Sequence, residues 1–160
     1  MPLLIDRPPA AHATPSFTAA PKRILSATPS FRPSASLREI DALADLGPDW
    51  DGYDAPPIAP KAITSARSIA EHFEDECRRQ GFDIPEAVIS PTPEGGVRID
   101  WKNRSARYDI AIDIPPAADQ VSLLFRPPAD LVSRRLLGSA ADAAKQAFTL
   151  WVEMTDRYGR

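Results

Sequence analysis

Three aspartates lie within six residues of one another, interleaved with a tryptophan, a glycine and a tyrosine, in the segment Asp49–Asp54. Carboxylates at this spacing are the oxygen ligands with which a calcium-binding loop begins. An EF-hand loop begun at Asp49 needs further oxygen ligands where this chain has Tyr53 and Pro60, so the match fails and no metal site is predicted. A weak, irregular cation site is the alternative. Asp49 and Asp51 are instead expected to accept hydrogen bonds from nearby backbone N–H groups in a turn.

The aromatic residues of this segment indicate packing and recognition. Ordering two large rings costs entropy, so a plain connector does not need them and they are expected to pack against something. The run from Glu39 to Asp54 holds six carboxylates and no basic residue. The alternative, which applies above all to Trp50, is that Trp50 and Tyr53 fill the gap between the first two helices and the sheet edge; of the two, Tyr53 is the one expected to be exposed. The segment therefore predicts a contact surface for a protein partner of basic character, formed by Trp50, Asp51, Tyr53 and Asp54.

No residue stands out as a catalytic group. Cys77 falls on the apolar side of a predicted helix, which indicates a buried, inert thiol. His72 is five residues away on another face of that helix, so the two cannot form a dyad within it. The sequence has no nucleophile elbow, phosphate-binding loop or dinucleotide-binding fingerprint. We therefore predict a protein that is not an enzyme and uses no cofactor, with a small enzyme lacking any recognisable motif as an alternative.

A cluster of basic residues around one predicted hairpin indicates a second alternative, nucleic-acid binding. Basic and aromatic side chains on a sheet can bind single strands. Trp101 and Tyr108 fall in the apolar register of their strands, however, and Asp100 and Asp109 interrupt the positive charge. The hairpin would act together with the basic N-terminal arm. Its basic residues are Arg98, Lys102, Arg104 and Arg107.

The composition is that of a single soluble domain preceded by a proline-rich arm. Of the 160 residues, the first 35 hold seven of the 18 prolines and have a net charge of +3, from four basic residues and one acidic residue. They show no helical or strand period and predict a disordered arm. Residues 36–160, with 15 basic and 21 acidic residues, have a net charge of −6 and form the predicted domain.

The same composition favours the cytoplasm. No apolar run approaches the roughly 20 residues that span a bilayer. Only three apolar residues stand together before Asp6, so no secretory signal is expected, and the single cysteine excludes an internal disulfide. We therefore predict a cytoplasmic protein that has no contact with a membrane. A transit peptide within the arm is the alternative.

The period of the apolar positions predicts the elements that position these residues. Ser36-Leu37-Arg38-Glu39 matches a capping box and begins a first helix, which Gly47-Pro48 ends. A second helix begins near Pro60 and ends at Gly81, with Cys77 on its apolar side and Glu74 on its polar side. A last helix is predicted over residues 139–156.

Between the second and last helices, the apolar positions repeat every second residue. Strands are predicted near 87–90, 97–102, 108–114 and 121–126, and the short turns between them indicate antiparallel neighbours. The sequence therefore predicts an α+β fold, a four-stranded antiparallel meander covered on one face by two to three helices. Such a meander has two edges, expected near Ala87 and Val121, through which a second copy could pair to form a homodimer.

Two motifs in this order resemble those of a widespread family of small bacterial and phage-derived proteins for which no activity is known. They are W-D-G-Y-x-A-P-P-I at residues 50–58, and P-T-P-E-G-G-V-x-I-D-W at the end of residues 85–101. The resemblance covers roughly residues 37–114. Members usually have glycine where this chain has Asp54, and aspartate tolerates a left-handed backbone better than most residues. The resemblance implies a cytoplasmic accessory or mobile-element protein and no catalytic residue.

Overall fold

The computed structural model of the chain describes residues 34–104, 107–127 and 134–158. The predicted disordered arm lies outside these residues, apart from its last two, Ser34 and Ala35, at the start of the first helix. None of the helices within the described ranges combines the length and apolar character needed to cross a membrane. The elements in chain order are α1 (Ala35–Ala42), a short 3-10 helix (Leu43–Asp45), α2 (Pro60–Gln80), β1 (Ala87–Pro91), β2 (Val97–Asn103), β3 (Tyr108–Ile114), β4 (Val121–Arg126), β5 (Arg134–Gly138) and α3 (Ala140–Tyr158).

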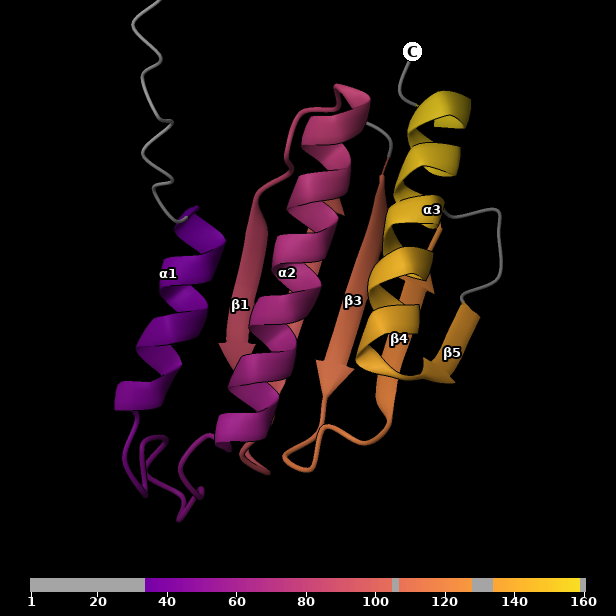
Figure 1. Cartoon of the computed structure of the whole chain (residues 1–160). Coiled ribbons are helices and arrows are strands. Elements are labelled where there is room, and N and C mark those ends of the chain that lie inside the picture. The colour runs from indigo at the N-terminus through magenta and orange to yellow at the C-terminus, as the bar shows by residue number, and fades with distance from the viewer. Residues whose placement is uncertain (1–33, 105–106, 128–133, 159–160) are drawn as a thin grey trace, which may run out of the picture. The chain divides into compact units, whose positions relative to one another are not determined.

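The strands form a single antiparallel sheet in the order β1-β2-β3-β4-β5 (Figure 1). The predicted α+β fold is confirmed, but the predicted number of strands is wrong because β5 extends the sheet by one. Residues 134–138 read Arg-Arg-Leu-Leu-Gly, without the alternation that marks a strand in a sequence. Val121 therefore lies in an interior strand, and the second edge of the sheet is β5.

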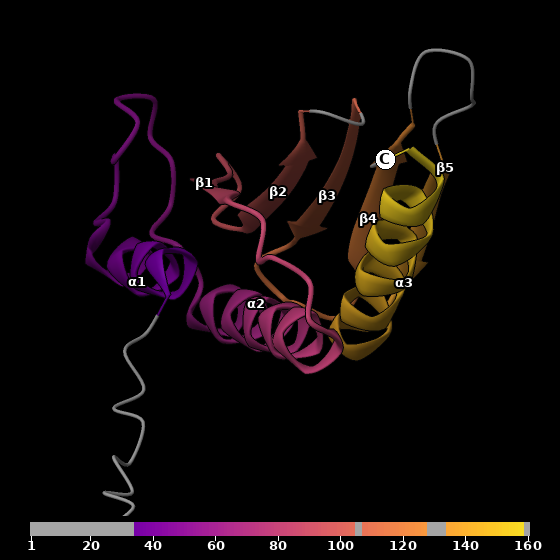
Figure 2. The same ribbon diagram turned by 90° about the horizontal axis from the view of Figure 1, so that it is seen from above.

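The part of the chain from Ser34 on that the structure describes has two layers, with α1, α2 and α3 on one face of the sheet (Figure 2). α1 lies beside β1, α2 runs along the middle, and α3 covers the side of β4 and β5 (Figures 1 and 2). The apolar residues that face the helices lie opposite one another on neighbouring strands. One such row is formed by Ile89, Ile99, Ile112, Leu123 and Leu136. No helix in the described ranges covers the opposite face, which we call the open face.

An aromatic cluster joins the two layers. Phe73 of α2 stacks on Trp101 of β2 with ring centroids 4.4 Å apart, and its edge meets Trp151 of α3 at 5.9 Å. The hydroxyl of Tyr108 donates to the backbone oxygen of Trp151 at 3.3 Å and shares a 2.9 Å hydrogen bond with Thr155 Oγ1. Trp101 and Tyr108 are each 1% exposed, so both lie in the core, as their strand register predicted.

The helix boundaries agree with the predicted ones in α2 and differ in α1. α2 runs from Pro60 to Gln80, and the left-handed backbone of Gly81 (φ 75°), the C-cap, ends it as predicted. α1 begins two residues earlier than predicted, because Ser34 is the N-cap and its Oγ accepts a 3.2 Å hydrogen bond from the backbone nitrogen of Leu37. The predicted capping box is therefore wrong, and Ser36 is a buried residue inside the helix.

Candidate functional site

The loop that enters α2 is held in one conformation by its own aspartates. Asp51 Oδ1 accepts hydrogen bonds from the backbone nitrogens of Tyr53 at 2.8 Å and Ala55 at 3.3 Å. Asp49 Oδ1 accepts one from the nitrogen of Asp54 at 3.0 Å, and its own backbone nitrogen donates to the Ala55 oxygen at 2.8 Å. The predicted turn role of both aspartates is confirmed. We call residues 49–55 the 49–55 loop.

The two aromatic residues of the 49–55 loop lie in different surroundings. Trp50 is half-buried against the hydrophobic core, and its Nε1 donates a 3.1 Å hydrogen bond to the backbone oxygen of Pro56. Tyr53 is 88% exposed, so it is the more exposed of the two, as expected. Gly52 (φ 75°) and Asp54 (φ 63°) on either side of it both have left-handed backbones. The loop therefore uses Trp50 as its anchor and presents Tyr53 to solvent.

Three connectors meet at the end of the sheet where this loop lies (Figure 1). The backbone nitrogen of Ala59 donates to the oxygen of Gly95 at 2.9 Å. A Cβ placed on Gly95 would lie 2.9 Å from the Pro57 oxygen and 3.9 Å from the ring of Pro116, so only glycine fits this junction. Residues 46–59, 92–96 and 115–120 contain no basic residue. We call this region the acidic end; its carboxylates are Asp49, Asp51, Asp54, Glu94 and Asp119.

A cavity of about 710 Å³ opens on the open face beside the acidic end. Among the described residues, no group of three or more His, Cys, Asp or Glu side chains is arranged to hold a metal ion. Two hydroxyls reach the cavity. Thr92 Oγ1 accepts from the backbone nitrogen of Gly96 at 3.1 Å, and Ser122 Oγ accepts from Arg135 Nε at 2.8 Å. The first bond holds the turn between β1 and β2, and the second joins side chains of β4 and β5. The charged lining residues are Glu94, Asp113, Asp119 and Arg135.

The structure does not bring the four basic residues of the predicted nucleic-acid surface together. Arg98 lies at the start of β2, bound to Asp100 at 2.7 Å and to Asp113 at 2.8 Å. Its pKa is raised, first by the hydrogen bond to Asp100. Lys102, at the far end of β2, is exposed, and so are the two arginines of the following turn, Arg104 and Arg107. The aromatic rings that would stack on bases, Trp101 and Tyr108, are buried in the core on the other face.

Cys77 and His72 lie apart, as the helix geometry predicted. Cys77 is fully buried, and burial raises the pKa of its thiol to about 11, which keeps it protonated and unreactive at neutral pH. His72 lines a shallow groove of about 550 Å³ between α2 and α3, together with Phe148 of α3. Neither residue has the partners of a catalytic nucleophile and base among the described contacts.

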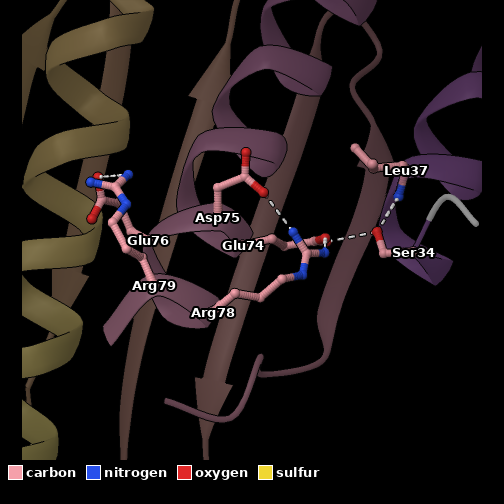
Figure 3. Close-up of polar contacts among 7 residues, drawn as sticks. All are labelled: Ser34, Leu37, Glu74, Asp75, Glu76, Arg78 and Arg79. Carbon is pink, nitrogen blue, oxygen red and sulfur yellow. Dashed lines mark hydrogen bonds and ion pairs between the residues drawn. The ribbon is translucent and has the colours of Figure 1, made fainter. Parts of the chain in front are cut away.

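Sequence reasoning missed a buried carboxylate. Glu74, predicted on the polar side of α2, is 2% exposed and lies between α1 and α2 (Figure 3). Its Oε1 accepts a 2.7 Å hydrogen bond from Ser34 Oγ, and its Oε2 accepts one from Arg78 Nη2 at 2.9 Å (Figure 3). The available signal was its spacing of four and eight residues from Ala70 and Ala66, which are both buried. This contact fixes the start of α1, and a 2.5 Å ion pair between Asp41 and Arg67 fixes its end.

Comparison of the chain with protein-family models, with curated proteins and with solved structures found no match.

Proposed function

We propose that this protein is a non-enzymatic interaction or regulatory protein, and that it binds a basic protein partner through the 49–55 loop. The observation that carries this proposal is Tyr53, a large aromatic side chain that is 88% exposed on a loop fixed by hydrogen bonds. A pre-ordered loop loses little conformational entropy when it binds. Tyrosine is also among the residue types that contribute most to protein interfaces.

The charges around Tyr53 support a partner with basic side chains. Asp51 and Asp54 flank the tyrosine, and the three connectors of the acidic end hold five carboxylates and no lysine or arginine. Charge of one sign around an aromatic anchor speeds the approach of an oppositely charged partner and disfavours acidic ones. Trp50 supports the loop from the side of the core, so its contribution to binding is indirect.

We also infer a cytoplasmic accessory or mobile-element role in a bacterium or phage. The support is the resemblance carried by residues 50–58 and 85–101. Those two stretches are neighbours in space, because Gly95 of the second lies against Pro56 and Pro57 of the first. The glycine of the second motif and the prolines of the first therefore form one junction, directly after the 49–55 loop.

The binding proposal is tested by comparing how much partner the unaltered protein and the Tyr53→Ala variant capture. Full-length protein would be used to capture partners from extracts of its host, with mass spectrometry as the readout, and thermal unfolding would be measured in parallel. Loss of an anchor residue costs about 2 kcal/mol, or roughly thirty-fold in affinity, so we expect the partner to be lost. Because Tyr53 is almost fully exposed, the melting temperature should stay unchanged.

Two controls separate the contact from other effects. Val88→Ala removes another exposed apolar side chain, on β1, and should leave both partner recovery and stability intact. Recovery by the unaltered protein should fall as salt rises, because the proposed partner is basic. Equal recovery by Tyr53→Ala and the unaltered chain, or loss of recovery only together with loss of stability, would refute the proposal.

A further inference from the structure

β5, the strand at the edge of the sheet, carries two exposed leucines, Leu136 on the helix-covered face and Leu137 on the open face. Leu136 is 40% exposed and Leu137 is 59% exposed, and they belong to the same five-residue strand. One side of β5 pairs with β4, and no strand in the described ranges pairs with the other side. An unpaired edge with apolar side chains is a template for pairing with another chain.

We propose that two copies of this chain pair antiparallel through β5 and form one continuous ten-stranded sheet. A two-fold antiparallel pair must be centred on a residue, because facing side chains must project from the same side of the sheet. Centring the pair on Leu136 places Leu136 opposite its own copy and Arg135 opposite Leu137, and it includes all five residues of the strand. Centring it on Arg135 would place two guanidinium groups face to face, and centring it on Leu137 would pair only three strand residues. The strand is therefore self-complementary in one register.

The same register completes the cavity on the open face. Across that face, a row of facing residues runs from Arg98 through Asp113 and Ser122 to Leu137. In the dimer, the next position in the row is Arg135 of the partner subunit. Facing side chains across strands lie about 5 Å apart at Cβ, so this guanidinium would reach the rim of the cavity. Glu94 and Asp119 line that cavity, so the second copy supplies a cation to an acidic site.

The proposed dimer is a weak one. A single five-residue strand pair with two leucines per copy buries less than the about 1,600 Å² of a standard stable interface. We therefore expect a dissociation constant on the order of micromolar or weaker, so that the dimer forms in a concentration-dependent way. The 49–55 loop takes no part in it, and the dimer does not depend on the proposed partner.

Sedimentation velocity of the full-length chain over a range of concentrations tests the association. We expect the mass to rise from that of one chain to that of two, and Leu136→Lys, which would place two ammonium groups face to face, to abolish the rise. Val88→Lys is the matched control, because Val88 is 46% exposed on β1 at the opposite edge, and it should still dimerise. A monomer at every concentration, or a dimer lost with Val88→Lys and kept with Leu136→Lys, would overturn the proposal.

Two cysteine substitutions, compared by disulfide cross-linking, test the register of the proposed β5 pair. Leu136→Cys places two thiols directly opposite each other and should give a disulfide-linked dimer under mild oxidation. Leu137→Cys places them two residues apart along the strands and should cross-link far more slowly. The native Cys77 is buried and should not interfere. Equal cross-linking of the two variants would show that the register is wrong.

Discussion

The two faces of the sheet carry different side chains, apolar and buried on one face and largely charged on the other. On the face that the helices cover, Val97, Ile99 and Trp101 of β2 are each at most 1% exposed, and aromatic stacking closes the layer. On the open face, the same strand carries Arg98 between two aspartates, and Arg126 lies 3.8 Å from Asp109. The covered face holds most of the apolar area that stabilises the fold, while the open face can vary in charge at little cost.

The open face is nevertheless ordered. Asp100 is 8% exposed and Ser122 is 5% exposed, although no helix of the described ranges lies over them. Arg98 donates a 2.7 Å hydrogen bond to Asp100, and Arg135 donates a 2.8 Å hydrogen bond to Ser122. A charged face can therefore be fixed well enough for recognition without adding a second hydrophobic layer.

The difference in stability between the two faces can be tested by truncating one side chain packed on the covered face and one on the open face. This test has the largest expected effect. Phe73→Ala removes the ring that contacts Trp101, Phe148 and Trp151, and we expect a loss of about 3–5 kcal/mol in the free energy of unfolding. Val88→Ala on the open face should cost less than about 0.5 kcal/mol. Urea unfolding of both variants measures the difference. Similar losses would show that the open face contributes to stability as much as the core does.

The buried carboxylate of the helix layer provides the next largest effect. Glu74→Ala removes the acceptor of both Ser34 and Arg78, and we expect a loss of about 2–3 kcal/mol. Glu76→Ala, on the same helix, removes a partly buried carboxylate from another ion pair. That pair joins Arg79 to Glu76 at 2.7 Å, but the Glu76 side chain is only 15% exposed, so the exposed comparison is Asp75→Ala: Asp75 is 64% exposed, pairs with Arg78 at 2.6 Å, and its loss should cost about 0.5 kcal/mol. Equal effects of Glu74→Ala and Asp75→Ala in urea unfolding would mean that Glu74 is not held as tightly as its contacts indicate.

A smaller loss of stability is expected at alkaline pH, where the buried Cys77 thiol of the helix layer titrates. Burial raises the pKa of the Cys77 thiol from 9.0 to about 11, so the folded state retains its proton where the unfolded chain loses it. The stability gained from the neutral thiol is complete below pH 9 and is lost as the pH rises to about 11. The loss should reach the order of 2 kcal/mol.

The corresponding measurement is the free energy of unfolding of the unaltered chain and of Cys77→Ala between pH 7 and 11. The slope should be shallower in the variant, and Tyr108, whose pKa burial also raises, contributes to the slope that remains. Identical slopes in the two proteins would contradict the assignment to Cys77.

The sequence predicted the regular elements well and the contacts between distant elements poorly. The second helix, the first four strands and the turn aspartates all have local signals, namely a spacing of apolar residues or a known turn chemistry. β5 lacks such a signal, because two adjacent arginines and two adjacent leucines do not alternate. The capping box at Ser36 was a valid local match that lost to Ser34, whose hydroxyl also reaches Glu74 on another helix.

The sequence by itself determined which side of each strand is apolar, where α2 begins and ends, and that the 49–55 loop is a turn fixed by aspartates. Only the tertiary structure decided that Glu74 is buried, that a fifth strand forms one edge, and that Gly95 lies against Pro56 and Pro57, which follow the 49–55 loop. The physical reason is the range of the interactions. Periodicity and turn chemistry act over a few residues, whereas the pairing of β5 with β4 joins residues 9 to 17 positions apart, and the contacts of Glu74 with Ser34 and of Gly95 with Pro57 join residues more than 30 positions apart.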